Sequence, residues 1–250
     1  MYSIALRIVS RTKGAASGVE VGVIEAGLVG LVRGLWAGRF AFRADEPPLT
    51  LHDGGLIREA WDERLRASAL DLRQLMRQSV KTGERAVERA DLVVLTHGHS
   101  DHTGSAVDIA KGHGAAVVAM VELADWLGSQ GVSDNVHGIN KGGTVEVDGV
   151  KVTMTDARHS SSTADGTYAG EAAGVVVELE NGTKVYHAGD TCAFGDMQLI
   201  GRIHEPDVAI VPIGDYFTMG PREAAVALEL LGVKRCIPCH YGTFPLLTGT

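Results

Sequence analysis

The segment LTHGHSDHTG (95–104) carries the densest group of chemically active side chains in the sequence. Its ligand-type members are His97, His99, Asp101 and His102. Imidazole nitrogen and carboxylate oxygen are the ligands that zinc and similar divalent metals take from proteins. A loop after an apolar strand can turn four such groups toward one point, because it is free of the side-to-side alternation of a strand. A single histidine is most often a polar surface residue, but four ligand-type residues within six positions favour a metal site.

Three more ligand-type residues stand alone, and each follows a predicted strand. His159 comes after VKVTMTDAR, Asp190 ends KVYHAGD, and His240 ends KRCIPCH. Taken singly, each is more typical of a hydrogen-bonded surface side chain. Because ligands in α/β folds gather at the carboxyl ends of strands, we expect the three to meet the dense cluster. One cluster and three single groups can bind two metals that share a carboxylate.

The elements that must position these residues alternate between strand and helix from Ala90 onward, which predicts an α/β layered architecture. Strands are expected at 90–97, 115–120, 207–214 and 234–240, hairpins at 144–155 and 173–190, and helices at 104–111, 121–127 and 221–232. The Asp-Gly pair at 148–149 and the Asn-Gly pair at 181–182 are typical hairpin turns. Pro221 suits the first turn of a helix and Gly232 its end.

Composition narrows the function classes. The 250 residues carry a formal net charge of -8, which argues against a general nucleic-acid binder, because neutralising phosphates needs a basic surface. Three cysteines are too few for a disulfide framework and suit a reducing compartment. The N-terminus shows no secretory signal pattern, and no apolar run approaches the ~20 residues of a membrane span. We therefore expect a soluble cytoplasmic protein with a small-molecule substrate and no membrane partner.

The order of the candidate ligands resembles the signature of the metallo-β-lactamase superfamily: His-x-His-x-Asp-His, a lone His, a lone Asp and a final His. Over 90–247 the motifs are also similar to a branch of metal-dependent hydrolases related to ascorbate-6-phosphate lactonase-like proteins. These motifs are LTHGHSDHTG, HGINKGGT, ARHSSS, YHAGDT, PIGDYFTMGP and HYGTFPL. The resemblance implies an αββα sandwich with a dinuclear metal centre at one edge.

The resemblance also implies the ligands of two divalent metal ions, zinc or manganese. One ion would be held by His97, His99 and His159, the other by Asp101, His102 and His240, and Asp190 would bridge them. The implied reaction is hydrolysis by a hydroxide that bridges the two metals. Asp101 would be catalytic, because it could orient that nucleophile or pass its proton to the leaving group.

The substrate that the branch implies is a small ester or lactone, and a β-lactam could be cleaved by the same hydroxide. Two alternatives stay open. A phosphodiesterase or nuclease of the same fold would use the same metals, although the acidic chain shows no added nucleic-acid-binding domain. A non-catalytic metal-binding assembly protein would keep the site without turnover.

Four further residues are candidates for supporting or substrate-binding roles: His187, Tyr216, Thr218 and Tyr241. His187 precedes Asp190 by three positions and could steady its loop by hydrogen bonding, behind the metal ligands. The other three adjoin motif residues and could donate hydrogen bonds to a substrate oxyanion. For each of the four, ordinary packing is an equal alternative.

Residues 1–89 are expected to form an atypical N-terminal segment, distinct in character from the metal-binding hydrolase region at 90–250. The run VEVGVIEAGLV (19–29) is the best candidate for a strand there. Apolar residues recur at helical spacing over 56–89, which predicts an amphipathic helix that packs on the core or pairs with a second copy in a homo-oligomer. The stretch at 45–67 is similar to part of the core of the mismatch-repair protein MutS, without its P-loop.

The segment CIPCHYG (236–242) contains Cys-x-x-Cys-His, the attachment signature of c-type haem. Haem attachment needs export, which nothing in the sequence indicates. The alternation along 234–240 favours a strand instead, with Pro238 at an edge or an end of it. We interpret the motif as a strand that delivers His240, with both cysteines as small buried apolar residues.

Overall fold

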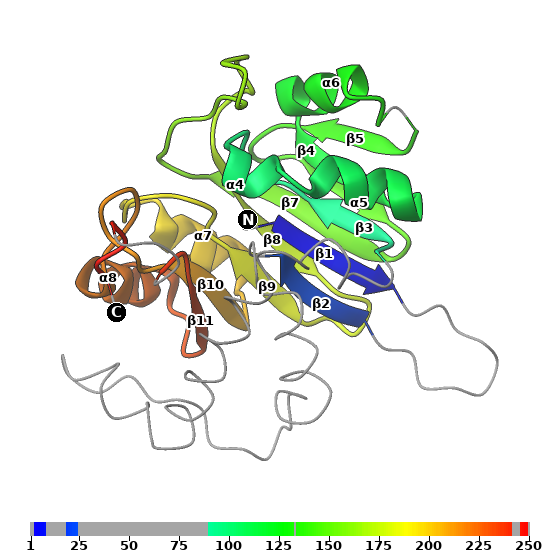
Figure 1. The fold of residues 1–250 in the computed structure, drawn as a ribbon. Coiled ribbons are helices and arrows are strands. Elements are labelled where there is room, and N and C mark those ends of the chain that lie inside the picture. Colours follow the sequence, from blue (N-terminus) through cyan, green and yellow to red (C-terminus); the bar gives the residue numbers. More distant parts are fainter. Residues whose placement is uncertain (1–2, 9–18, 25–89, 133, 242–245, 250) are drawn as a thin grey trace, which may run out of the picture.

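The computed structural model describes residues 3–8, 19–24, 90–132, 134–241 and 246–249. These residues form two β-sheets that lie face to face, with helices packed on the outer face of each sheet (Figure 1). The first sheet has the strand order β2-β1-β3-β4-β5, and the second has the order β11-β10-β9-β8-β7-β6. The α/β class and the αββα arrangement expected from the sequence are confirmed.

From residue 90 onward the elements follow the predicted order, except that the pattern missed the strand β5 and the helices α4 and α7. The strands are β1 (Ser3–Ile8), β2 (Val19–Ile24), β3 (Leu92–Val94), β4 (Ala116–Met120), β5 (Val136–Ile139), β6 (Thr144–Val147), β7 (Val150–Asp156), β8 (Ala173–Glu178), β9 (Lys184–His187), β10 (Val208–Pro212) and β11 (Cys236–Cys239). The helices are α4 (Ser100–Thr103), α5 (Ala106–His113), α6 (Val121–Ser129), α7 (Met197–His204) and α8 (Pro221–Leu231).

The first sheet combines two strands from the start of the chain with three strands from residues 92–139. Strands β3, β4 and β5 run parallel, and β1 pairs antiparallel with β3. Strand β2 pairs antiparallel with β1, so the strand expected at 19–29 is present and lies at the edge of this sheet. The helix expected at 56–89 and the MutS-like stretch at 45–67 lie outside the described residues.

The second sheet changes from antiparallel to parallel along its width. Strands β6 to β9 pair antiparallel in chain order, and β9, β10 and β11 then run parallel. Asp148 and Gly149 have φ of 48° and 83°, which is the pair of positive values that a type I′ hairpin turn requires. Because β9, β10 and β11 run parallel, the loops that follow them all leave the same edge of the sheet.

The core lies in three layers of apolar side chains. Between the sheets, Leu92 and Val118 of the first sheet pack with Val152 and Val177 of the second, and all four are fully buried. Two outer clusters join α5 and α6 to the first sheet and α7 and α8 to the second. Each such Val or Leu stabilises the fold by about 1.5–3 kcal/mol relative to exposure. These layers hold the strand ends, and therefore the loops of the site, in fixed positions.

The helix predicted at 104–111 is α5, which begins and ends two residues later, and the short helix α4 before it was not predicted. The short α4 takes up Asp101 and His102, which we expected on a loop. Asp101 stands in the first turn of α4, where the helix dipole favours a negative charge. The following α5 ends at Gly114, whose φ of 64° is the left-handed value typical of a helix end. Two of the candidate ligands thus sit on a helical turn.

The segment around Cys236 is a strand, as expected. Strand β11 is the outer strand of the second sheet, which suits Pro238 because proline has no N–H for a further neighbour. Cys236 packs toward the outer helices, whereas Ile237 and Cys239 pack on the opposite side. Neither Cys236 nor Cys239 forms a disulfide, and His240 leaves the strand with a positive φ of 56°.

Among the described residues, no helix has the length and apolar character needed to cross a membrane.

Candidate metal centre

The seven ligand-type residues expected from the sequence come together at one edge of the sandwich. They belong to the segments that follow β3, β7, β9 and β11, so each leaves the carboxyl end of a strand. One group consists of His97, His99 and His159, and the other of Asp101, His102, Asp190 and His240. Within each group, one nitrogen or oxygen atom per residue lies within 4.8 Å of those of the others. Four segments far apart in the sequence therefore build one cluster.

The first group consists of three imidazoles. His97 Nε2 lies 3.1 Å from His99 Nδ1. The ring of His159 stands at 80° to both of the other rings, with centroid separations of 5.2 Å to His97 and 5.1 Å to His99. The rings meet edge to face, so their nitrogens converge without stacking of the rings.

The second group combines two imidazoles with two carboxylates. Asp190 Oδ1 lies 3.3 Å from His102 Nε2, and Asp190 Oδ2 lies 3.2 Å from His240 Nε2. Asp101 Oδ2 lies 3.6 Å from His102 Nε2 and 3.5 Å from His240 Nε2. The Asp101 side chain is 45% exposed, whereas that of Asp190 is 5% exposed. Asp101 is therefore the member of this group that faces solvent.

Asp190 joins the two groups. Its Oδ2 atom also lies 3.9 Å from His97 Nε2 and 3.7 Å from His159 Nε2. One buried carboxylate is thus faced by four imidazole nitrogens, two from each group.

These separations fit donors that share metal ions. Zinc lies about 2.0–2.2 Å from histidine nitrogen and carboxylate oxygen, so two donors on one tetrahedral ion are about 3.3–3.6 Å apart. The donor pairs with the distances given above lie between 3.1 and 3.9 Å apart. Zinc and manganese both accept a set of imidazoles and carboxylates. The residues present therefore fit a pair of divalent metal ions.

Thr96, which the sequence analysis did not single out, connects the two groups from behind. Its Oγ1 lies 3.0 Å from His97 Nδ1 and 3.4 Å from His102 Nδ1, and the residue is buried. A hydroxyl oxygen has two lone pairs and can accept an N–H from each ring. Both rings then carry their proton on Nδ1 and present an unprotonated Nε2 as the ligand atom. The only signal in the sequence was the position of Thr96 directly before the dense cluster.

Burial and neighbouring charges set the protonation states. Burial, aided by the nearby His102, holds the pKa of His97 well below its ordinary value. Burial by itself would raise the pKa of Asp190, but the His102 and His240 imidazoles outweigh it and hold that pKa well below the usual range. Burial likewise disfavours charge on His240, yet its hydrogen bonds to Asp101 and Asp190 raise its pKa to about 9. The cluster therefore offers a neutral imidazole at His97 and an ionised carboxylate at Asp190.

Short contacts fix the loops that carry the ligands. The Gly98 N–H donates to Ser161 Oγ at 3.2 Å, and Ser160 Oγ lies 3.4 Å from His99 Nε2. A Cβ on Gly98 would collide with the side chain of Ala169, so only glycine allows the two loops to approach. The loop after β3 is thereby clamped to the loop after β7.

The four supporting candidates lie in different surroundings. His187 is fully buried in β9, and its Nδ1 accepts a hydrogen bond of 2.9 Å from the N–H of Gly189, next to Asp190. The Tyr216 side chain is exposed, and Tyr241 packs against the outer cluster of the second sheet. The hydroxyl of Thr218 is buried and has no hydrogen-bond partner in the part of the chain that the structure describes. None of these four belongs to either ligand group.

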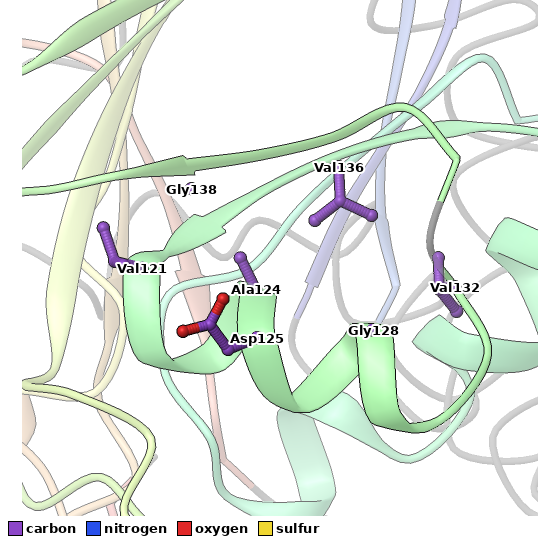
Figure 2. Close-up of a pocket in the computed structure, with 7 residues that line it drawn as sticks. All are labelled: Val121, Ala124, Asp125, Gly128, Val132, Val136 and Gly138. Atoms are coloured by element: carbon purple, nitrogen blue, oxygen red, sulfur yellow. The ribbon is translucent and has the colours of Figure 1, made fainter.

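A separate shallow pocket of about 310 Å³ lies between α6 and β5 (Figure 2). Its walls are Val121, Ala124, Asp125, Gly128, Val132, Val136 and Gly138. Asp125 is the one titratable side chain in this lining, and no wall residue belongs to the ligand groups. The pocket therefore offers no set of groups for metal binding or hydrolysis.

Comparison with protein families gives a match over most of the chain. The family described as "Beta-lactamase superfamily domain" matches residues 43–241. This match begins well before residue 90, where the motif resemblance begins, and it includes the stretch at 45–67.

Relatives of this chain include named hydrolases. A UPF0173 metal-dependent hydrolase from Herpetosiphon aurantiacus is 49% identical over 173 residues, which cover 68% of this chain and 72% of the relative. Another from Rubrobacter xylanophilus is 54% identical over 164 residues, covering 64% of this chain and 67% of the relative. Among solved structures, Igni18, described as a novel metallo hydrolase from Ignicoccus hospitalis, is 37% identical with a TM-score of 0.58, over 64% of this chain and 68% of its own.

Proposed function

Because the chain belongs to the beta-lactamase superfamily domain family and is a metal-dependent hydrolase of the metallo-β-lactamase superfamily, we propose that it cleaves a small ester or lactone at the edge site. The observation that carries this proposal is the buried Asp190 carboxylate, faced by four imidazole nitrogens at 3.2–3.9 Å. This arrangement suits two cations that share one carboxylate. The similarity of the motifs over 90–247 to the lactonase-like branch supports the choice of ester or lactone.

Each ligand group would hold one divalent ion, and we propose zinc as the metal and manganese as the alternative. One ion would be held by His97, His99 and His159, and the other by Asp101, His102 and His240, with Asp190 shared. His99 would bind through Nδ1, because its Nε2 lies next to Ser160 Oγ. His97 and His102 would bind through Nε2, because their Nδ1 atoms face Thr96.

When bound, two divalent ions lower the pKa of water toward neutrality and polarise a carbonyl oxygen. We assign the proton transfers to Asp101. Burial would raise the pKa of this carboxyl, but its hydrogen bond to His240 outweighs burial and keeps that pKa low. Asp101 is therefore ionised at neutral pH, and its partial exposure lets it reach both water and substrate. It can accept a proton from the attacking water and deliver it to the leaving oxygen.

His187 would act as a positioning residue behind Asp190. Its bond to the Gly189 N–H holds the turn that presents the bridging carboxylate. Gly189 has a φ of 64°, and its Cβ position is closed by the carbonyl oxygen of Ala173, 2.7 Å away. The turn before Asp190 is thus fixed on two sides.

Turnover of a substrate panel tests the proposal. The panel contains an aliphatic lactone, a carboxylic ester, a β-lactam and a phosphodiester, each offered to zinc-loaded and manganese-loaded protein. We expect hydrolysis of the lactone or the ester, lost in Asp190→Asn and in His102→Ala. His137→Ala is the matched control, because His137 lies on β5 and bonds Asn135 at 3.0 Å, outside both ligand groups.

Two outcomes of this panel would replace the proposal. Preferred cleavage of the phosphodiester would support a phosphodiesterase or nuclease. Two bound metals without turnover of any substrate would support a non-catalytic metal-binding protein.

A further inference from the structure

The loop that follows β10 stands between two loops that carry candidate ligands. Strand β10 pairs in parallel with β9 on one side and with β11 on the other. Asp190 follows β9 and His240 follows β11, so the loop at 213–220 leaves the same edge between them. No residue of this loop belongs to the ligand groups, although it occupies the centre of that edge.

Both neighbouring loops hold this loop in place. The Met219 N–H donates to the carbonyl oxygen of Thr191, next to Asp190, at 3.2 Å. On the other side, Gly214 lies against His240, and a Cβ at Gly214 would collide with the carbonyl oxygen of His240. The base of the loop is therefore fixed relative to the metal ligands themselves.

The tip of the loop has a costly backbone conformation. Asp215 and Tyr216 have φ of 62° and 63°, which lie in the left-handed region that residues other than glycine rarely adopt. Local hydrogen bonds hold this shape: Asp215 N–H donates to the carbonyl oxygen of Met219 at 3.0 Å, and Tyr216 N–H donates to Asp215 Oδ1 at 2.7 Å. Backbone strain of this kind clusters at functional sites, where it fixes the direction of a side chain.

The strained tip presents two aromatic rings to solvent. Tyr216 is 64% exposed and Phe217 is 47% exposed. Their rings meet edge to face at 77°, with centroids 4.6 Å apart, so each supports the other. The two adjoining rings therefore offer an apolar surface on a fixed loop that leaves the same sheet edge as the ligand loops.

We propose that Tyr216 and Phe217 form an apolar wall beside the metal centre that binds the hydrocarbon part of the substrate. This inference rests on the proposed function and names its substrate class more closely: esters or lactones with an extended alkyl or aryl group. The polar ester group would lie at the ligand cluster, and the hydrocarbon chain would lie along the two rings. The wall acts through its rings, so the Tyr216 hydroxyl is not needed as a hydrogen-bond donor.

A homologous series of ligands tests the wall without relying on turnover. Straight-chain alkyl hydroxamates, from acetyl to octanoyl, are titrated into the metal-loaded protein by calorimetry, and the matching esters are assayed in parallel. Each methylene that the wall covers improves affinity by about fourfold, the value of burying one CH₂. We expect this dependence on chain length in the wild type, and a flat response in Tyr216→Ala and Phe217→Ala.

Two further variants show whether the rings themselves bind the hydrocarbon chain. Tyr216→Phe keeps the ring and should keep the dependence on chain length. Ile203→Ala is the matched control, because Ile203 is 69% exposed in the last turn of α7, outside this loop. Both aromatic side chains are exposed, so their truncation should leave the fold and the metal content unchanged.

Several outcomes would overturn the inference. One is an unchanged dependence on chain length in both alanine variants, and another is the same loss in Tyr216→Phe as in Tyr216→Ala. A fall from dimer to monomer in light scattering, with the dependence on chain length intact, would make the pair a contact between copies instead. The protein could also hydrolyse no substrate while its hydroxamate affinity still depends on chain length and the two alanine variants abolish that dependence. This result would reject the proposed function alone and keep the apolar wall.

Discussion

Replacing Thr96 with valine keeps the shape of the side chain and removes the hydroxyl that His97 and His102 share. In the native protein Thr96 Oγ1 lies 3.0 Å from His97 Nδ1 and 3.4 Å from His102 Nδ1. Valine offers no acceptor, so both Nδ1–H groups would be left in a fully buried environment. Each ring could then move its proton to Nε2, and the Nε2 atom that faces Asp190 would no longer have a lone pair for a metal ion.

The size of the effect follows from the two distances. A buried donor left without a partner costs about 1–3 kcal/mol, and partners behind metal ligands are typically worth about 10–100-fold in metal affinity. The contact to His97 has the length of an ordinary hydrogen bond, whereas that to His102 is at the weak end. We therefore expect a loss near the upper end of that range for the ion on His97, and a smaller loss for the ion on His102.

Competition with a chromophoric chelator measures the two metal affinities separately, and nitrogen NMR of the imidazoles reports the tautomer of each ring. Thr96→Ser is the control, because it keeps the hydroxyl. Wild-type affinity for both ions in Thr96→Val, with His97 still protonated on Nδ1, would show that the Thr96 hydroxyl does not set the tautomer of these rings.

Three other predictions follow from the site. Gly98→Ala should lower the free energy of unfolding by about 1–3 kcal/mol in urea titrations, because the new methyl group collides with Ala169 and forces the two loops apart; an unchanged midpoint would show that the clamp is not tight. Burial lowers the pKa of His187 to about 3, so as pH falls below about 6.5 the unfolded chain takes up a proton that the folded chain refuses, and stability drops. In metal-free protein, the slope of the unfolding free energy against pH should therefore be smaller by about 1.4 kcal/mol per pH unit in His187→Asn than in the wild type, between pH 6 and 4. Equal slopes would show that His187 does not stay unprotonated in the folded protein. Zinc at 100 times its dissociation constant should stabilise the wild type by about 2.7 kcal/mol per site, which is measured as a rise in Tm. The His159→Ala variant should show only part of this rise. The full rise in that variant would exclude His159 as a ligand.

Elements decided by neighbouring residues could be predicted from the sequence. Helix α8 begins at Pro221 and ends before Gly232, whose φ of 68° is the left-handed value that glycine adopts easily. The turn at Asp148 and Gly149 follows from the same preference for positive φ. The convergence of His159 with the dense cluster was also predictable, because it depends only on which strand ends share an edge.

Features decided by contacts between distant segments could not be predicted. The role of Thr96 depends on two rings that lie on opposite sides of its hydroxyl, and no spacing in the sequence encodes that. Helix α4 was missed because a four-residue helix is too short to show a period in its apolar residues. The left-handed backbone at Asp215 and Tyr216 has no glycine to announce it, and it exists because Gly214 and Met219 are held by neighbouring loops.

The proposed function requires two metal ions that share the Asp190 carboxylate. The metal-to-protein ratio of Asp190→Asn is compared with that of the wild type by elemental mass spectrometry, after dialysis against a weak chelator. Asparagine keeps the size of the side chain and removes the charge that faces four imidazoles. We predict two ions per chain in the wild type and fewer than one in Asp190→Asn. Two tightly held ions in Asp190→Asn would show that the two metals do not depend on a shared Asp190 carboxylate.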